Sequence, residues 1–285
     1  MEYHRPKSFA EALPLLSKFG DSATVIAGGT DLIVDMKFRG FRPSCLININ
    51  SVKDLSYVKE NGEGLKIGAL TSIQALKKNE LLQKEYTGIA DAARQFASLQ
   101  IRNLATVGGN LVRSSPCGEM APPLITLDAT VIIASEKKER EVELVDFFLG
   151  PGQNVLEADE LLREIRLQPL PARTGSSYWR LSYRDVLDLA IVGVGSRVTL
   201  DTDNRVTKAR VALGAVAPKP IRAEKTEALL KGQLLDENLI AEAGKMASQE
   251  ATPISDQRSS ADYRTNMTAV LTRRSLRSAA AAAAK

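Results

Sequence analysis

Two short segments that join an apolar run to a pair of glycines constrain the fold more than any other feature of the sequence. One reads VIAGGTDL at 25–32 and the other reads ATVGGN at 105–110. Glycine pairs permit positive φ angles and let a ligand lie against bare backbone. Successive N–H groups in such a turn form an anion-binding nest, to which hydroxyl and amide side chains add hydrogen bonds. The two segments together predict two loops that converge on one long ligand containing a pyrophosphate or a ribose.

The local interpretation of each segment stays open, because a Gly-Gly-Asn sequence alone is more often an ordinary tight turn. Neither segment is a P-loop, which requires Gly-Lys-Ser/Thr, and neither is the GxGxxG dinucleotide motif. The residues before the second segment, 91–100, favour a helix that carries Phe96 and Leu99 on one side. We expect residues 101–103 to leave this helix before the glycines.

Length and composition indicate an ordinary globular protein and disfavour nucleic-acid binding. The 285 residues are enough for two domains and a sizeable core. Hydrophobic residues make up 44% of the chain and charged residues 25%, as is typical of folded proteins. The formal net charge is only +4 and aromatic residues are 5%, so no basic surface with stacking aromatic side chains is expected.

The rarity of cysteine and histidine excludes several kinds of active site. Cys45 and Cys117 stand outside any CxxC or Cys/His cluster, so the chain cannot itself hold an iron–sulfur cluster or a structural zinc. His4 is the only histidine, which excludes most Ser-His-Asp, Cys-His and His-metal schemes. If the chain belongs to an enzyme, a cofactor therefore carries the reaction.

The same features predict a cytoplasmic protein without a transmembrane segment. Two isolated cysteines fit a reducing compartment. Residues 1–6 do not resemble a signal peptide, and no apolar run approaches the length needed to span a membrane.

The order of the predicted elements indicates an α+β architecture with a boundary near 169–171. Within about the first 55 residues, a capping box at Ser8 and Glu11 begins a helix, and a strand, a second helix and another strand follow. Beyond the boundary, strands precede polar helices, which is the α+β order. The strand candidates are 177–181, 189–199 and 209–216, and the helix candidates are 224–231, 237–249 and 260–278.

Several motifs together resemble the FAD-binding medium subunit of the molybdenum hydroxylases, the group of xanthine dehydrogenase, aldehyde oxidase and carbon monoxide dehydrogenase. They are AGGTDL at 27–32, IRNLATVGGNL at 101–111, Ser-Pro at 115–116, ELLREIRL at 160–167 and YWRLSYRDVLDLAIVGVG at 178–195. The resemblance extends over the chain to about residue 278. Each glycine motif alone is weak, but the two at this spacing are specific.

The resemblance implies a fold and a division into domains. An FAD-binding domain of the vanillyl-alcohol-oxidase or CO dehydrogenase flavoprotein type is expected over 1–170, with α/β subdomains of about 1–55 and 56–170. A C-terminal domain over 171–278 is expected to combine a three-stranded antiparallel sheet with a helical bundle. Residues 279–285 are expected to form a tail, to which we assign no function.

The resemblance also implies a set of FAD-binding residues. The segment 25–32 would wrap the pyrophosphate and ribityl region, the second glycine segment would form the other pyrophosphate loop, Phe96 would lie near the adenine half and Leu162 would pack on the flavin. Phe96 is equally open to an ordinary role in the core. The full set is Val25, Ile26, Ala27, Gly28, Gly29, Thr30, Asp31, Leu32, Phe96, Ala105, Thr106, Gly108, Gly109, Asn110, Ser115, Glu119, Leu162 and Arg180.

Two of these positions depart from the family pattern. Glu119 stands where many relatives have an aspartate that contacts the ribityl hydroxyls. Arg180 stands where relatives often have a lysine near the flavin ring, and an arginine has a different geometry. Our hypothesis is that Arg180 stabilises negative charge on the reduced flavin, with a salt-bridged arginine as the alternative. No cysteine-rich insertion is present, so a [4Fe–4S] cluster in this chain is excluded.

In such a family the reaction is divided among three polypeptides. A large subunit with molybdopterin-bound molybdenum oxidises the substrate, a small subunit passes electrons through [2Fe–2S] clusters, and FAD delivers them to an external acceptor. A dimer of heterotrimers is the usual assembly. A self-sufficient FAD oxidoreductase of the vanillyl-alcohol-oxidase or cell-wall-precursor reductase type, and a flavin-free binding protein, remain as alternatives. The sequence leaves the substrate and the acceptor open.

Overall fold

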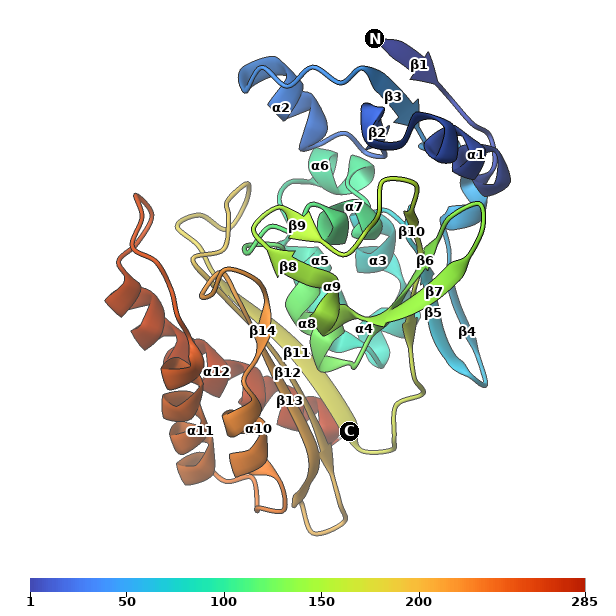
Figure 1. The fold of residues 1–285 in the computed structure, drawn as a ribbon. Coiled ribbons are helices and arrows are strands. Elements are labelled where there is room, and N and C mark those ends of the chain that lie inside the picture. The colour runs from blue at the N-terminus through green and yellow to red at the C-terminus, as the bar shows by residue number, and fades with distance from the viewer. Residues whose placement is uncertain (285) are drawn as a thin grey trace.

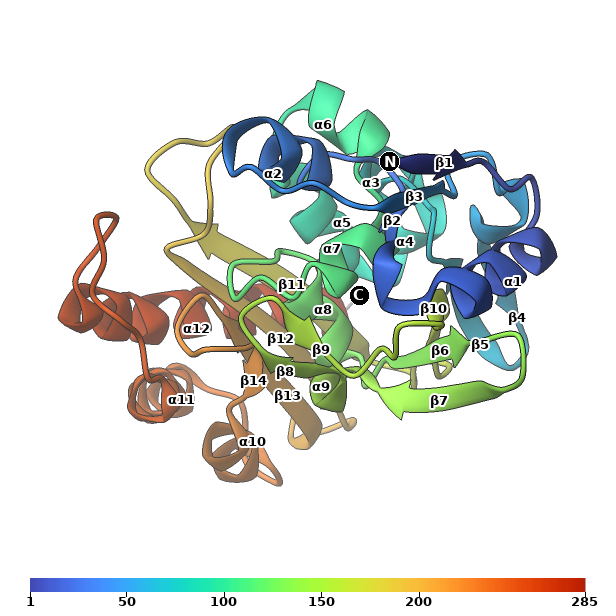
Figure 2. The same ribbon diagram turned by 45° about the horizontal axis from the view of Figure 1, so that its top comes forward.

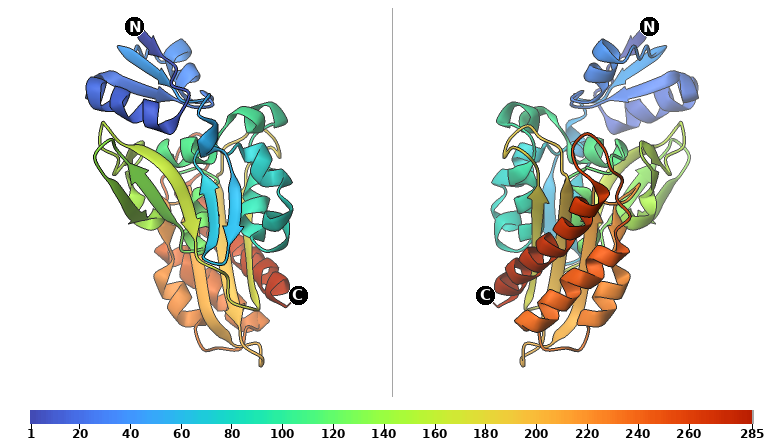
Figure 3. Two further views of the ribbon diagram at one scale, coloured as in Figure 1. Left: turned by 90° about the vertical axis from the view of Figure 1, so that its right-hand side faces the viewer. Right: turned by 90° about the vertical axis from the view of Figure 1, so that its left-hand side faces the viewer.

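The computed structural model describes residues 1–284 and divides them into three packed units (Figure 1). The first unit, at the N-terminus, lies over one end of the second, and the third packs against the opposite side of the second (Figures 1 and 3). Strands and helices alternate around a parallel sheet in the first unit, whereas the second and third units have antiparallel sheets with helices packed against them, so the fold is α+β as predicted.

The first unit is a small parallel sheet with two helices. Its strand order is β1-β3-β2, and both pairings are parallel. The capping box predicted at the first helix is present, because the Ser8 hydroxyl accepts a hydrogen bond from the backbone N–H of Glu11. The elements are β1 (Glu2–His4), α1 (Phe9–Phe19), β2 (Ala23–Ile26), α2 (Leu32–Phe38) and β3 (Cys45–Asn48).

The second unit is a five-stranded antiparallel sheet in the order β4-β5-β10-β6-β7, with helices packed against it and a two-stranded ribbon of β8 and β9. Strand β4 forms one edge of this sheet and β7 forms the other. The strands are β4 (Val58–Asn61), β5 (Gly64–Gly68), β6 (Thr130–Ala134), β7 (Glu139–Glu143), β8 (Phe148–Gly150), β9 (Gln153–Asn154) and β10 (Leu161–Leu167). The helices are α3 (Ile73–Lys78), α4 (Glu80–Lys84), α5 (Thr87–Gln95), α6 (Leu99–Leu104), α7 (Val107–Val112), α8 (Ala121–Thr126) and α9 (Leu144–Phe147).

The helical prediction around residues 91–103 was wrong in its boundaries. Helix α5 ends at Gln95, and Ala97 has a φ of 35°, which ends the helical run. A new helix, α6, then begins, because the Ser98 hydroxyl accepts a hydrogen bond from the N–H of Ile101. Residues 101–103 are therefore helical and do not form the exit from a longer helix.

The third unit is an antiparallel sheet covered on its outer face by helices (Figures 2 and 3). The three long strands predicted for this sheet are present, and the two-residue strand β14 extends it to four. The strands are β11 (Thr174–Leu181), β12 (Val192–Leu200), β13 (Val206–Gly214) and β14 (Ile221–Arg222), and the helices are α10 (Glu224–Leu230), α11 (Glu237–Glu250) and α12 (Ala261–Ala283). Within residues 1–284, no helix is long and apolar enough to cross a membrane.

The alanines near the C-terminus, where a tail was expected, are helical. Helix α12 continues through them to Ala283, and Ala279 and Ala283 are buried. Helix α12 approaches β11 at Gly175, where a Cβ atom would lie only 2.1 Å from the carbonyl oxygen of Ala279. The small side chains thus allow close packing of the helix on the sheet. Lys285, the last residue of the expected tail, lies outside the described residues.

Asp128 links the second unit to the third. It lies between α8 and β6, and its carboxylate pairs with Arg197 at 2.7 Å, Lys208 at 2.8 Å and Arg210 at 2.6 Å. Arg197 is buried, with a side chain 5% exposed. Burial alone would raise the pKa of Asp128, but hydrogen bonds from Lys208 and Arg210, together with the charge of Arg197, hold it well below its usual range.

We predict that Asp128→Asn lowers the free energy of unfolding at pH 7 by about 2–3 kcal/mol, because Arg197 loses the carboxylate that compensates its buried charge. A depressed pKa in the folded state stabilises the protein above the pKa of the unfolded state, and this contribution is lost as the pH falls. Denaturant unfolding from pH 7 downward should therefore show that the difference in free energy of unfolding between wild type and variant shrinks progressively as the pH falls below about 4.

Lys208→Ala is the matched control for this experiment. Lys208 contacts the same carboxylate, but its side chain is 46% exposed, so its loss should cost less than about 1 kcal/mol. Equal effects of the two substitutions, or a difference from the wild type that does not change with pH, would contradict the role assigned to Asp128.

Candidate functional site

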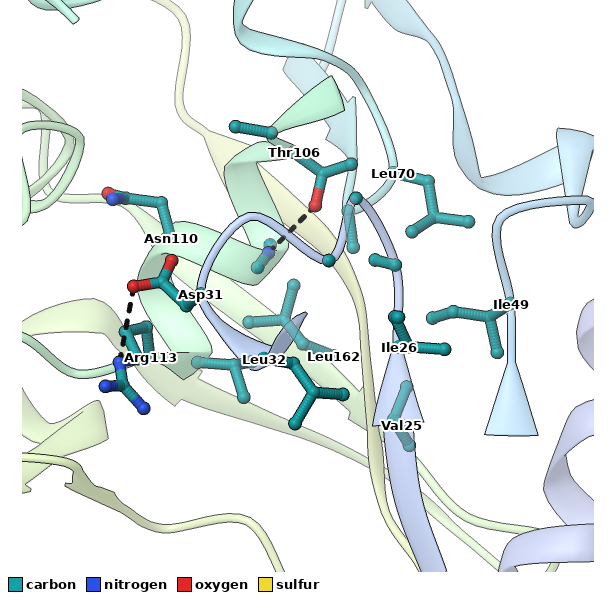
Figure 4. A pocket seen from close by; sticks show the side chains of 18 of the residues that line it. Val25, Ile26, Asp31, Leu32, Ile49, Leu70, Thr106, Asn110, Arg113 and Leu162 are labelled. Atoms are coloured by element: carbon teal, nitrogen blue, oxygen red, sulfur yellow. Dashed lines mark hydrogen bonds and ion pairs between the residues drawn. The ribbon is translucent and has the colours of Figure 1, made fainter. Parts of the chain in front are cut away.

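A cavity of about 320 Å³ lies between the first and second units, where the two glycine segments meet (Figure 4). The segment 25–32 forms one wall, and residues between 105 and 113 form part of the other. Leu162 of β10 and Leu70 contribute apolar surface. The volume falls within the range of small-molecule sites, and a position between two packed units is a common one for such sites.

The first glycine segment is shaped by close backbone contact and by one positive φ angle. Strand β2 ends at Ile26, and Gly28 then lies so close to α6 that a Cβ atom would be 1.9 Å from the carbonyl oxygen of Leu104. Gly29 has a φ of 71°, as the glycine pair predicted. Helix α2 begins directly afterwards, so its N-terminal end borders the cavity.

The second glycine segment is a helix start rather than the turn with a backbone nest that was predicted. Gly108 and Gly109 lie in the first turn of α7 and do not have positive φ angles. The Thr106 hydroxyl caps this helix by accepting the N–H of Gly109 at 3.1 Å. Gly108 is required for packing, because its Cβ atom would lie 2.7 Å from both the Cβ atom and the carbonyl oxygen of Ala69.

The cavity brings together all of the sequence-predicted site residues except Ser115, Glu119 and Arg180. Phe96 lines the cavity and also belongs to the core of the second unit, so both interpretations of it apply. The lining residues that sequence reasoning missed are Asp35, Ile49, Ala69, Leu70, Val112, Arg113, Leu156, Glu160 and Leu161. Helical spacing was a usable signal for two of them, since Asp35 and Arg113 each lie four residues after a predicted site residue, Asp31 and Gly109.

Glu119 and Arg180 form a buried ion pair outside the cavity lining. Nη1 of Arg180 lies 3.0 Å from Oε1 of Glu119, and the two side chains are 2% and 8% exposed. Burial raises the pKa of Glu119, and the charge of Arg180 opposes that shift. Arg180 also donates to the carbonyl oxygens of Asp185 at 3.1 Å and Asp188 at 3.0 Å. The structure thus places Arg180 in the salt-bridged arrangement that was the alternative to a flavin contact.

The charged side chains that line the cavity are also paired. Glu160, whose side chain is 1% exposed, accepts hydrogen bonds from Nε and Nη2 of Arg140 at 2.8 and 2.6 Å. Arg113 pairs with Asp31 and Asp35. Histidine, lysine, tyrosine and cysteine are absent from the cavity lining in the described part of the chain. The lining can bind and orient a ligand, but it offers no unpaired acid or base for proton transfer.

These residues fit FAD on structural grounds. The backbone of Gly28 and Gly29 and the start of α2 border the cavity, and bare backbone of this kind suits a pyrophosphate. Val25, Ile26 and Leu162 form apolar walls that suit a flat ring system (Figure 4). Residues 1–284 contain no group of three or more histidine, cysteine, aspartate or glutamate side chains that could hold a metal ion.

Two family models match the chain. The model of the FAD binding domain in molybdopterin dehydrogenase matches residues 1–171, and the model of the CO dehydrogenase flavoprotein C-terminal domain matches residues 177–279. The carbon monoxide dehydrogenase medium chain of Hydrogenophaga pseudoflava is 33% identical over 98% of this chain and 96% of its own. The xanthine dehydrogenase FAD-binding subunit of Escherichia coli O157:H7 is 30% identical over 99% of this chain and 96% of its own.

Solved structures agree with these matches. Carbon monoxide dehydrogenase from Hydrogenophaga pseudoflava, in a form that lacks the Mo-pyranopterin moiety, superposes with a TM-score of 0.94 at 33% identity, covering 99% of this chain and 98% of that one. Quinoline 2-oxidoreductase from Pseudomonas putida 86 gives a TM-score of 0.91 at 30% identity, covering 100% and 98%. The chain therefore belongs to the FAD-binding medium subunits of the molybdenum hydroxylase family and is an oxidoreductase component that carries FAD.

Proposed function

We propose that this chain is the electron-transfer subunit of a heterotrimeric molybdenum hydroxylase. In this proposal a small partner subunit delivers electrons from [2Fe–2S] clusters, and a large partner subunit oxidises the substrate at molybdenum. Bound FAD supplies the chemistry of accepting electrons singly and releasing them in pairs to an external acceptor. The chain's own residues bind the cofactor and orient it between these partners.

One observation carries the proposal: the cavity that the two glycine segments line has no unpaired acid or base in its lining. Glu160 is held by Arg140, and Asp31 and Asp35 are held by Arg113. A flavoenzyme that turns over an organic substrate alone needs a substrate pocket with groups that move protons. Because the acidic side chains of the lining are all paired, they support the proposal that this chain holds a cofactor while partner subunits perform the substrate chemistry.

The composition of the chain supports the assignment of the metal centres to partners. A [2Fe–2S] cluster requires four cysteine ligands, or two cysteines and two histidines in a Rieske centre, and this chain has only Cys45, Cys117 and His4. Both are free thiols, which supports the proposed cytoplasmic location. The names of relatives refer to different substrates, among them carbon monoxide, xanthine and nicotinate, at 30–34% identity. We therefore propose no substrate. For the assembly we propose a dimer of heterotrimers, as the family resemblance implies.

Affinity purification of the tagged chain from its native source tests this proposal. We expect two further subunits to co-purify, with flavin in the visible spectrum and both iron and molybdenum by metal analysis. A yellow single chain that oxidises a substrate unaided would contradict the proposal and favour a self-sufficient flavoenzyme.

We predict that Gly109→Val lowers the FAD content by at least about tenfold while leaving the fold largely intact. Gly109 lies in the first turn of α7 and lines the cavity, and a Cβ atom there would lie 2.9 Å from the Thr106 hydroxyl that caps the helix. A branched side chain would displace this cap and occupy ligand space. The ratio of flavin to protein absorbance after purification measures the loss, and circular dichroism checks the fold.

Gly62→Val is the control, because Gly62 lies in a turn and its Cβ atom would have no neighbour within 4 Å. It should retain FAD at the wild-type level. Stoichiometric flavin in Gly109→Val would refute the assignment of the second glycine segment to the FAD site.

Arg180→Gln separates a structural role of Arg180 from a direct flavin contact. We predict a loss of stability of about 3 kcal/mol, because Glu119 would remain buried without its partner. The double variant Arg180→Gln, Glu119→Gln should recover much of this loss, since it removes the uncompensated charge. Denaturant unfolding measures both effects.

The flavin midpoint potential of Arg180→Gln gives the second readout. Because Arg180 contacts Glu119 and two backbone carbonyls rather than the cavity, we expect a shift smaller than about 30 mV, which corresponds to about 1.4 kcal/mol for a two-electron couple. A larger shift would instead support the hypothesis that Arg180 stabilises the reduced flavin directly.

A further inference from the structure

Helix α2 borders the cavity, but little of it is anchored by packing. None of its seven residues is buried, and Ile33, Val34 and Phe38 are exposed, the last at 80%. A helix of this length is not stable on its own in water and depends on tertiary contacts. The loop that leads into it, 28–31, lines the cavity. What holds α2 in place therefore also shapes the cavity.

Arg113 reaches α2 from the other side of the cavity. It is the C-cap residue of α7, in the second unit. Its Nη1 atom lies 3.0 Å from Oδ2 of Asp35. Its Nε atom lies 3.5 Å from Oδ1 of Asp31, and Figure 4 shows this second pair. Within residues 1–284, these are the ion pairs that join α2 to the second unit.

The burial of the three side chains indicates which contact matters most. Asp35 is 16% exposed, Arg113 is 37% exposed and Asp31 is 59% exposed. The Arg113–Asp35 pair is thus the shorter and the better shielded of the two, so water and salt weaken it less. Asp35 also pairs with Arg39 at 2.8 Å, but Arg39 is the C-cap residue of α2 and is 66% exposed. That second pair cannot connect the two units.

We propose that Arg113, with Asp35 and Asp31, forms a latch that holds α2 over the cavity and slows the release of FAD. Arg113 acts here as a positioning residue, through the two carboxylates. The proposal rests on FAD occupying this cavity. Arg113 comes from the second unit, and Asp31 and Asp35 come from the first. The two walls of the cavity can therefore separate fully only when the ion pairs of Arg113 break.

A direct contact between Arg113 and the FAD pyrophosphate is the competing role, and the two roles make opposite predictions for Asp35. In a latch, Asp35 cooperates with Arg113, so removing its charge speeds FAD release. If Arg113 binds phosphate, Asp35 competes for the same guanidinium and adds like-charge repulsion, so removing its charge slows release. The sign of the effect at Asp35 decides between the two roles.

The test measures the rate at which FAD leaves the full-length chain, by fluorescence of released FAD after dilution. We expect Arg113→Gln and Asp35→Asn each to release FAD about fivefold faster than the wild type, as for a partly shielded ion pair. The double variant should release FAD no faster than Arg113→Gln alone, because the loss of Arg113 already breaks both ion pairs of the latch. Thermal unfolding by circular dichroism shows whether each variant is folded.

Two controls make the result specific to the latch. Arg39→Gln removes an equal charge from the solvent side of Asp35 and should leave the release rate within about twofold of the wild type. Raising the salt from about 0.05 M to 0.5 M should speed release from the wild type but not from the double variant, because salt screens the ion pair.

Slower release from Asp35→Asn would overturn the latch and assign Arg113 to phosphate binding. Unchanged rates in all variants would also overturn it. A folded wild-type chain that does not bind added FAD would refute the cavity assignment itself, which is a separate failure from that of the latch.

Discussion

The close approach of backbone segments at glycine is the constraint on which the rest of this structure depends. Gly28 brings the end of β2, in the first unit, against the carbonyl of Leu104, at the end of α6 in the second unit. Gly108 brings α7 against Ala69, just after β5. Any side chain at either position would separate these elements. The cavity exists because the two segments lie this close while their remaining residues diverge around it.

The charged side chains at and near the cavity are arranged to bind a ligand rather than to transfer protons to it. Glu160 with Arg140, Glu119 with Arg180 and the two aspartates with Arg113 are each compensated within the protein. Each of these carboxylates is engaged by a guanidinium, so none is left free to take a proton from a bound ligand. A chain built in this way suits a cofactor that carries the chemistry and partners that carry the substrate site.

The sequence predicted which residues line the cavity better than it predicted their backbone conformation. The two glycine segments predicted the walls of the cavity, because glycines that permit close approach are visible in the sequence. The prediction of a turn at 106–110 was wrong, because Thr106 is the N-cap residue that begins α7. Ser98 begins α6 in the same way, and neither N-cap signal was used. The resemblance to the molybdenum hydroxylase family predicted the arrangement of sheets and helices, apart from the short strand β14 and the packed end of α12.

Contacts between side chains that are far apart in the sequence could not be predicted. Arg180 was expected beside the flavin, but it pairs with Glu119, 61 residues away in sequence, and both are buried. Which of several possible partners a charged side chain meets depends on the packed fold. Helical spacing from Gly109 could have placed Arg113 at the cavity, but its pairing with Asp31 and Asp35 could not be predicted, since these carboxylates belong to another unit.

The most direct test of the central claim is the anaerobic mixing of the FAD-loaded chain with the reduced [2Fe–2S] subunit purified from the same complex. The visible absorbance of oxidised flavin is followed in time. Our account predicts that this absorbance falls on mixing, without any organic substrate present. Flavin that stays oxidised in the presence of the reduced partner, but is reduced when an organic substrate is added to the chain alone, would contradict it.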